Sequence, residues 1–336
     1  MSKVLVIGAS GQLGSVVLNQ LLEAKQECVA FVRPSSKFSP PTSDYLQVAR
    51  GDLADASSVD KACIGIKQVI ATASSIIPRQ GDKFGINEVE NYQHLVKACQ
   101  HHKIEHLIYI SAFSSPFDQI VPEFRVKRQI EQLIMQSGIP YTIFRGAAFM
   151  DIYYAVMGSR LAMDGVLHPT LLRGFWLTKL YSKLTFGLLE NRGIALLPGN
   201  GKVKQSFICI NDVAAFMVKA LTVPSAKNRI IELGGPEILS WHDVSDIYAD
   251  LLDKKIINLA IPSFILNLYR VILRPFSPAG ENIMSTLFLL SRHECAIDMT
   301  ELCKEFSINM SNTRQFLLQK LNSQNASGAT YDSRKL

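Results

Sequence analysis

The chain has 336 residues, of which 48% are hydrophobic and 19% are charged, and its formal net charge is +6. This length and composition predict a globular protein with a large core, in one large domain or two unequal ones. The charge is modest and no basic run is long, which argues against nucleic-acid binding. The six cysteines form no CxxC pair, so neither a zinc site nor a disulfide framework is indicated.

The N-terminal segment predicts a dinucleotide-binding turn. Val4–Ile7 has the pattern of a buried parallel strand, and glycines follow at positions 8, 11 and 14. Gly8 would let the chain reverse, Gly11 would let backbone N–H groups approach a pyrophosphate, and Gly14 would let the next helix pack closely. The other residues of the turn that we expect to line this site are Ser10, Gln12 and Leu13. A plain strand–helix turn is the alternative.

The end of the second strand predicts which dinucleotide is bound. The strand Glu27–Val32 is followed by Arg33 and, four residues later, Lys37. Domains that select NAD usually place an acidic residue here, whereas a cation suits a 2′-phosphate. NADP(H) is therefore favoured over NAD(H). A solvated loop arginine is the alternative interpretation.

Strands and helices then alternate as far as Phe149. The predicted strands are Tyr45–Ala49, Gln68–Ala73, His106–Ile110 and Tyr141–Phe144, and the predicted helices are Val59–Ile64, Asn87–His102 and Phe124–Ser137. This alternation predicts an α/β fold with a doubly wound Rossmann parallel sheet. Ligands of such sheets bind at the carboxyl ends of the strands. The candidate site residues at those ends are Asp52, Leu53, Ala73, Ser74, Ser111 and Arg145.

We predict that residues 1–149 form the dinucleotide-binding domain, with its sheet completed by segments near 205–235. Residues 150–323 would form a smaller, mainly helical lobe that binds a substrate or a partner, and the polar residues 324–336 a disordered tail. Within the lobe, a helix is predicted over Asp151–Met163 and strands over Phe207–Ile210 and Ile230–Leu233. A helix opened by Ser240 is expected to run to about Leu252.

Two apolar segments of this lobe allow two interpretations each. On a helical wheel, Leu171–Leu189 has an apolar side and a polar side that carries Lys179 and Lys183. It is either a lid or packing helix, or a helix that contacts a membrane surface or a protein complex. Phe264–Phe276 is predicted to be a core helix, with membrane or partner contact as the alternative.

The compartment follows from what the sequence lacks. The first strand begins at once, leaving no room for a signal peptide, and no uncharged apolar run approaches the roughly 18 residues of a transmembrane helix. We expect a cytoplasmic protein, with a peripheral membrane association as the alternative.

Several short motifs, taken together, resemble one family. They are GASGQLG at 8–14, GDL at 51–53, YIS at 109–111, SGIPYTIFR at 137–145, INDVA at 210–214 and GGP at 234–236. In this order they resemble the atypical, NmrA-like short-chain dehydrogenases/reductases. The C-terminal part, including IDMT at 297–300, is similar to a subgroup with vinyl-chlorophyllide reductases and photosystem II assembly factors.

The resemblance implies an NAD(P)-binding Rossmann domain and a Tyr-x-x-x-Lys pair, in which the Lys holds the nicotinamide ribose. Here Lys127 occupies the Lys position, and Glu123 occupies the Tyr position. A carboxylate beside a Lys is expected to have a low pKa and to donate protons poorly. A surface ion pair is the alternative interpretation of these two residues.

Two functional hypotheses follow from this departure. The first is an NADPH-dependent reductase of a small, apolar substrate, in which Lys127 holds the ribose and Ser111 orients the substrate or carboxamide. The second is a non-catalytic NAD(P)H-binding redox sensor or assembly factor at a membrane complex. Neither hypothesis involves a metal ion.

Overall fold

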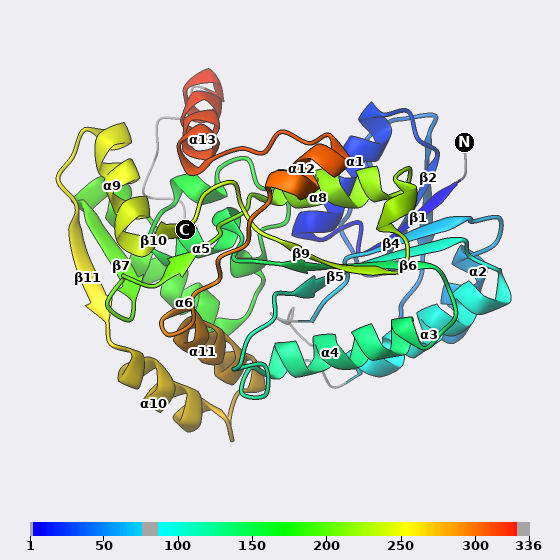
Figure 1. Ribbon diagram of the computed structural model, residues 1–336, viewed down its shortest axis with the longest axis horizontal. Coiled ribbons are helices and arrows are strands. Elements are labelled where there is room, and N and C mark those ends of the chain that lie inside the picture. Colours follow the sequence, from blue (N-terminus) through cyan, green and yellow to red (C-terminus); the bar gives the residue numbers. More distant parts are fainter. Residues whose placement is uncertain (1–2, 76–86, 328–336) are drawn as a thin grey trace.

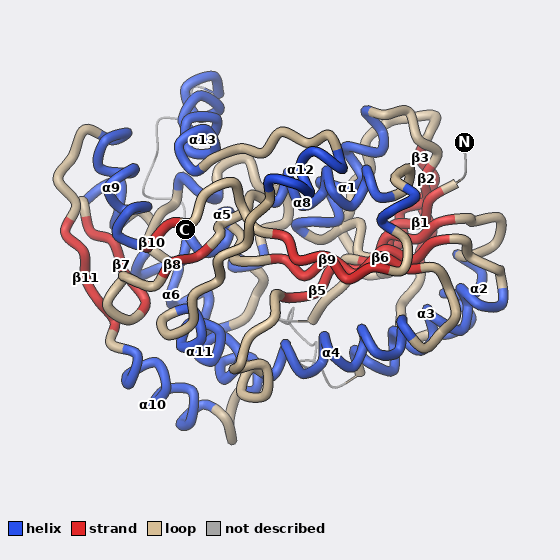
Figure 2. The backbone as a smooth tube through the Cα atoms, in the orientation of Figure 1, coloured by secondary structure: helices blue, strands red, loops and turns tan. Residues whose placement is uncertain are grey.

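The computed structural model describes residues 3–75 and 87–327, and its centre is a seven-stranded parallel sheet (Figures 1 and 2). The strand order is β3-β2-β1-β4-β5-β6-β9, and every neighbouring pair is parallel. The strands are β1 (Val4–Ile7), β2 (Cys28–Val32), β3 (Leu46–Arg50), β4 (Gln68–Ala71), β5 (His106–Ala112), β6 (Tyr141–Gly146) and β9 (Arg229–Leu233). The predicted α/β Rossmann fold is confirmed. The order reverses between β1 and β4, which is where such sheets bind their ligands.

Helices cover both faces of this sheet (Figure 1). One layer contains α1 (Gln12–Glu23), α8 (Ile210–Ala220) and α12 (Thr300–Phe306), and the other contains α2 (Ala56–Ala62), α3 (Glu88–His101) and α4 (Pro122–Met135). A buried apolar cluster lies between each layer and the sheet. All four residues of β1 are therefore buried, as expected for a strand that is covered on both faces.

The remaining elements form a lobe beyond the carboxyl ends of the strands, with its own apolar core around Tyr154, Trp241 and Tyr248. Its helices are α5 (Met150–Val156), α6 (Trp176–Thr185), α7 (Leu188–Arg192), α9 (Trp241–Leu252), α10 (Ser263–Leu273), α11 (Pro278–Leu290) and α13 (Thr313–Ser327), with 3-10 turns η1 (Leu161–Met163) and η2 (Thr170–Leu172). The third 3-10 turn, η3 (Pro224–Ala226), belongs to the sheet domain, where its Ala226 accepts a hydrogen bond from Thr142 of β6. It also contains two small sheets, the parallel pair β7 (Ile194–Pro198) and β11 (Ile257–Ile261) and the antiparallel pair β8 (Lys204–Gln205) and β10 (Leu239–Ser240).

Two predicted elements of this lobe are wrong. The helix expected over Asp151–Met163 ends at Val156, and Gly158 with a φ of 95° takes a left-handed conformation that an α-helix does not continue through. Phe207–Ile210 is not a strand. It makes a single bridge, from Ile208 to Phe149, before α8 begins at Ile210.

The C-terminal predictions also need correction. α10 is not a core helix, because Leu266 is its only buried residue and most of its apolar side chains face solvent. Residues 324–327 continue α13 instead of starting a disordered tail, and residues 328–336 lie outside the described part. Among the described residues, no helix is both long and apolar enough to cross a membrane.

Candidate cofactor and substrate site

The glycine turn between β1 and α1 is closely packed. A Cβ atom on Gly14 would lie 2.1 Å from the carbonyl oxygen of Gly8. Gly8 has a φ of 85°, and a Cβ there would lie 2.8 Å from the backbone nitrogen of Ala73. The Gly11 N–H donates to the Gly8 carbonyl at 2.8 Å. Gly8 and Gly14 therefore have the steric roles that the sequence predicts, a chain reversal and a close helix approach.

The residues at this turn fit the phosphate region of a dinucleotide. Gly11 is the N-cap of α1, and the first turn of this helix has no acidic residue, so its N–H groups present a positive dipole end. Gln12 and Ser74 line the same cavity, and each has a buried polar atom, Nε2 and Oγ, without a hydrogen-bond partner among the described residues. A buried polar atom without a partner is costly, so both are suited to bind a polar ligand.

The cavity continues from the glycine turn to α4, α5 and α11. Leu13, Thr72, Ser111, Glu123 and Lys127 line it. The lobe adds polar side chains that the sequence analysis missed, namely Tyr153, Thr170, Arg173, Asn282 and Thr286. No motif marks these residues, since they come from three distant segments that only the folded lobe brings together. Most of the remaining lining is apolar, including Phe124, Phe149, Ile152, Val156, Ile283 and Leu287.

The start of the 171–189 segment closes over the glycine turn. The Thr170 N–H donates to Gln12 Oε1 at 2.9 Å. The guanidinium of Arg173 lies near Gly11, because its Nη2 would be 3.7 Å from a Cβ built there. The lid interpretation therefore describes residues 170–173. It does not describe α6, where Thr178 and Thr185 are buried while Trp176, Leu180 and Leu184 are exposed.

Three charged residues lie one turn apart on the buried side of α4: Glu123, Lys127 and Glu131. Lys127 is only 4% exposed. Its Nζ donates to the carbonyl oxygen of Ile110 at 3.0 Å and lies 5.1 Å from the ring centroid of Tyr109. The Glu123 carboxylate accepts a 3.3 Å hydrogen bond from Asn282 Nδ2 instead of forming an ion pair with Lys127. The surface ion-pair interpretation is therefore wrong.

The expected low pKa of Glu123 is also wrong. Burial raises the pKa of this carboxyl to about 7, which outweighs the opposing effects of the Lys127 charge and of the Asn282 hydrogen bond. The sequence showed the neighbouring Lys but not the apolar wall that Phe124 and the lobe contribute. Near neutral pH, Glu123 is therefore suited to hold and donate a proton.

Glu131 has the opposite behaviour. It is 1% exposed, and Arg145 Nη2 and Arg128 Nη1 donate to its two oxygens at 2.6 and 2.5 Å. The Ser111 hydroxyl also donates to Glu131, at 2.5 Å. Burial alone would raise the pKa of Glu131, but the hydrogen bonds from Arg145 and Ser111 and the charge of Arg128 lower it overall. Ser111 lines the cavity with its hydroxyl in this cluster, whereas Arg145 is bound to Glu131 and Glu232 away from the lining.

The remaining predicted cofactor residues lie just after the carboxyl ends of the strands, outside the lining of this cavity. Arg33 follows β2, and Asp52 follows β3, where its Oδ1 accepts the Ala54 N–H at 3.0 Å. Ala73 follows β4 and accepts the Tyr92 hydroxyl at 2.8 Å. Because β1 to β4 are parallel, these positions lie on the same side of the sheet as the glycine turn, at the carboxyl ends of the strands. Lys37 and Leu53 lie in the loops after the same strands.

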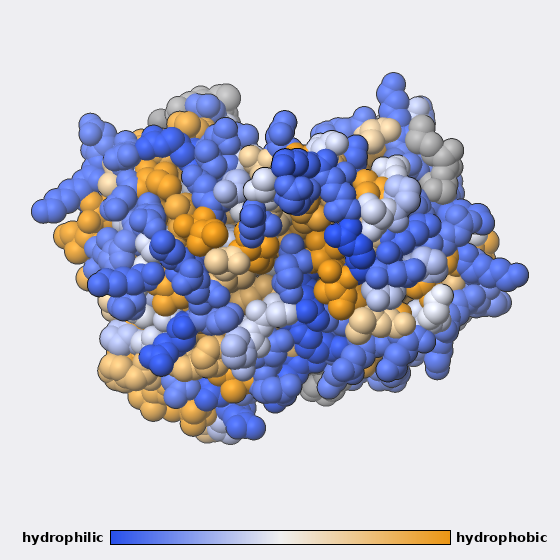
Figure 3. Space-filling view, viewed as in Figure 1, coloured by the Kyte–Doolittle hydropathy of each residue, from blue (hydrophilic) through white to orange (hydrophobic). Residues whose placement is uncertain are grey.

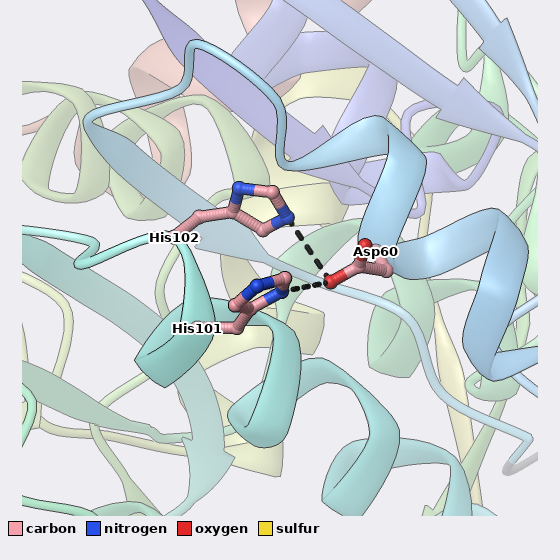
Figure 4. A group of neighbouring side chains, drawn as sticks. All are labelled: Asp60, His101 and His102. Atoms are coloured by element: carbon pink, nitrogen blue, oxygen red, sulfur yellow. Dashed lines mark hydrogen bonds and ion pairs between the residues drawn. The ribbon is translucent and has the colours of Figure 1, made fainter.

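A separate polar cluster lies where α2 and α3 meet (Figure 4). His101 Nδ1 and His102 Nε2 lie 2.8 and 3.0 Å from the same oxygen of Asp60. These hydrogen bonds, that of His101 first, lower the pKa of Asp60. The three donor atoms lie within 4.8 Å of one another, but a structural zinc site has four protein ligands and the described residues supply no fourth there. The cluster connects two helices and is not part of the cavity.

The fold and the glycine-turn cavity fit a dinucleotide-binding protein, and comparison with known proteins agrees. A family model described as NAD(P)H-binding matches residues 8–157. The photosystem II assembly factor Ycf39 of Trieres chinensis is 25% identical over 317 residues, which cover 93% of this chain and 89% of that protein. An NAD(P)H azoreductase of Xenophilus azovorans is 26% identical, over 72% of this chain and 71% of its own.

Solved structures show the same fold. The NADPH-dependent quinone oxidoreductase QOR2 of Escherichia coli, complexed with NADPH, aligns with a TM-score of 0.71 and 16% identity over 95% of this chain and 100% of that one. The triphenylmethane reductase of a Citrobacter species aligns with a TM-score of 0.70 and 18% identity, over 96% and 100%. Residues 8–157 thus match the NAD(P)H-binding family model, and the whole chain has the fold of these solved structures.

Gly14→Ala tests the close approach of α1 to the turn. The added methyl group cannot fit 2.1 Å from the Gly8 carbonyl, so we expect a loss of about 3 kcal/mol in the free energy of unfolding and weaker dinucleotide binding. Urea unfolding and a fluorescence titration measure the two effects. Asn19→Ala, at an exposed position of the same helix, should change stability by less than about 0.5 kcal/mol. Unchanged stability of the Gly14 variant would contradict the packing described above.

Proposed function

We propose that this protein is an NADPH-dependent reductase of a small, lipophilic substrate. The observation that carries the proposal is one continuous cavity that joins the glycine turn to Lys127 and Glu123. Its dinucleotide end is polar, and its far end has an apolar lining that suits a lipophilic molecule. The nature of the similar reductases supports this class of reaction.

Each group of residues in the cavity has a separate role in the proposed reduction. A bound nicotinamide would supply a hydride. Lys127, held by the Ile110 carbonyl, would bind the ribose hydroxyls, while the α1 N-terminus and Gln12 would hold the phosphates. Glu123 gives its proton to the substrate atom that gains negative charge when the hydride is added, and it is reprotonated from solvent. Hydride plus proton thus reduce a carbon–carbon, carbon–oxygen or nitrogen–nitrogen double bond without a catalytic tyrosine.

Turnover tests this proposal through the proton of Glu123. We expect NADPH oxidation with members of a panel of quinones, enones and azo compounds, with a rate that falls as the pH rises through about 7, because the donating form of Glu123 is then lost. Glu123→Gln should lower kcat by about a hundredfold and abolish that pH dependence without weakening NADPH binding. The exposed Glu90→Gln variant is the matched control. No oxidation across the whole panel would reject the reductase.

A second function is supported by a specific similarity. The relative that matches 93% of this chain is named as an assembly factor and not as a reductase. Under this alternative, bound NAD(P)H would be a structural or sensory ligand, and the exposed side of the lobe would bind the partner. Tight NADPH binding without turnover of any panel compound would favour it.

Arg33→Ala tests the preference between cofactors. If the guanidinium binds the 2′-phosphate, the variant should bind NADPH at least about tenfold more weakly, because hydrogen bonds to charged groups are the stronger class. Its affinity for NADH should not change, and both are measured by fluorescence titration. Lys25→Ala removes an exposed cation before β2 and should affect neither cofactor. Equal wild-type affinities for NADPH and NADH would contradict the assignment.

A further inference from the structure

α10 presents its apolar side to solvent. Its sequence places Phe264, Leu268, Val271, Ile272 and Pro275 within an arc of about 100° on a helical wheel. Phe264 is 70% exposed, and Leu268, Val271 and Ile272 are each about half exposed. Leu266, on the opposite side, is the buried residue of the helix. We call this exposed stripe, together with Phe276, the α10 face.

The surroundings of the α10 face extend the apolar surface. Phe276, just after the helix, is 83% exposed. Ile257 and Leu259 are also exposed on β11, the strand that leads into α10. α10 forms an outer corner of the molecule at the lower left of Figure 1, and Figure 3 shows hydrophobic residues gathered at that corner. A projecting apolar helix of this kind is costly in water and suggests a binding surface.

The charged residues around the α10 face indicate which kind of partner it binds. Residues 263–276 contain two arginines and no acidic residue. Arg274 and Tyr269 border the stripe on its two sides, and both are exposed. Arg274 Nε lies 3.8 Å from Glu281 Oε1, but the Arg274 side chain is 69% exposed and that of Glu281 only 12%, so the charge that faces solvent at this border is positive. An apolar stripe bordered by aromatic and basic residues is typical of helices that lie in a lipid interface.

We propose that the α10 face is a docking surface for an anionic lipid bilayer, with α10 lying in the headgroup region. The projecting shape suits insertion into a bilayer, and the exposed Arg274 on a segment without acidic residues attracts acidic headgroups. α10 packs on α11, and Asn282, Ile283 and Leu287 of α11 line the cavity. Docking through α10 therefore places the cavity wall one helix away from the bilayer. The proposal does not depend on turnover.

Vesicle flotation of the full chain tests this proposal. At low salt, the protein should float with vesicles of phosphatidylcholine and phosphatidylglycerol and much less with phosphatidylcholine alone. Leu268→Glu/Ile272→Glu should reduce the partition coefficient by about a hundredfold, because charge enters the buried side of the interface. Arg274→Ala should reduce it by about fivefold on anionic vesicles only. Ile64→Glu, at an exposed apolar site on the far side of the sheet domain, is the control and should float normally.

Other occupants of the α10 face give different outcomes. Flotation that survives the Leu268/Ile272 substitutions, or flotation that is lost only in Leu180→Glu/Leu184→Glu on α6, would overturn the assignment. A wild-type dimer in light scattering that the α10 variant makes monomeric, without flotation, would assign the face to a second copy and would also overturn it. Circular dichroism melting of each variant shows whether it remains folded.

Discussion

The buried carboxylate of Glu131 fixes the geometry of the site. Arg128 of the same helix, Arg145 at the end of β6 and Ser111 at the end of β5 all bind it. Because the Glu131 carboxylate is paired with the guanidinium groups of Arg128 and Arg145, its charge is tolerated in the protein interior. Removing one of these partners would leave a buried charge without compensation. It therefore holds α4 against the carboxyl ends of two strands. Once α4 is held there, the residues one and two turns earlier, Lys127 and Glu123, line the cavity.

The same helix thus carries two carboxyl groups whose pKa values are shifted in opposite directions. Glu131 is surrounded by donors and cations, which keep it ionised, whereas Glu123 faces an apolar wall, which favours its protonated form. A separation of this kind between neighbouring acids is how one site provides both a fixed charge and a proton donor. In the proposed reaction, this raised pKa would let Glu123 supply the proton that a tyrosine would otherwise donate.

The sheet could be predicted from the sequence because its signals are local. Buried strands, glycine turns and amphipathic helices each depend on neighbouring residues, so Val4–Ile7 and the turn after it are placed correctly. The pKa of Glu123 could not be predicted, because the burial that raises it depends on a cavity wall to which the lobe contributes, including residues of α11 more than a hundred positions later in the chain. The lobe was harder still, since Phe264–Phe276 has the composition of a core helix and only the fold shows that its apolar side is uncovered.

The role proposed for Glu123 requires a protonatable carboxyl inside the cavity. Carbon-13 NMR of protein labelled at glutamate carboxyls, with Glu123→Gln used to assign the signal, measures its pKa directly. The structure predicts a titration of the Glu123 carboxyl at about 7, well above the ordinary glutamate value of 4.5. A midpoint near the ordinary value would show that the carboxyl is an ionised neighbour of Lys127, and the proposed role of Glu123 as proton donor would then be wrong.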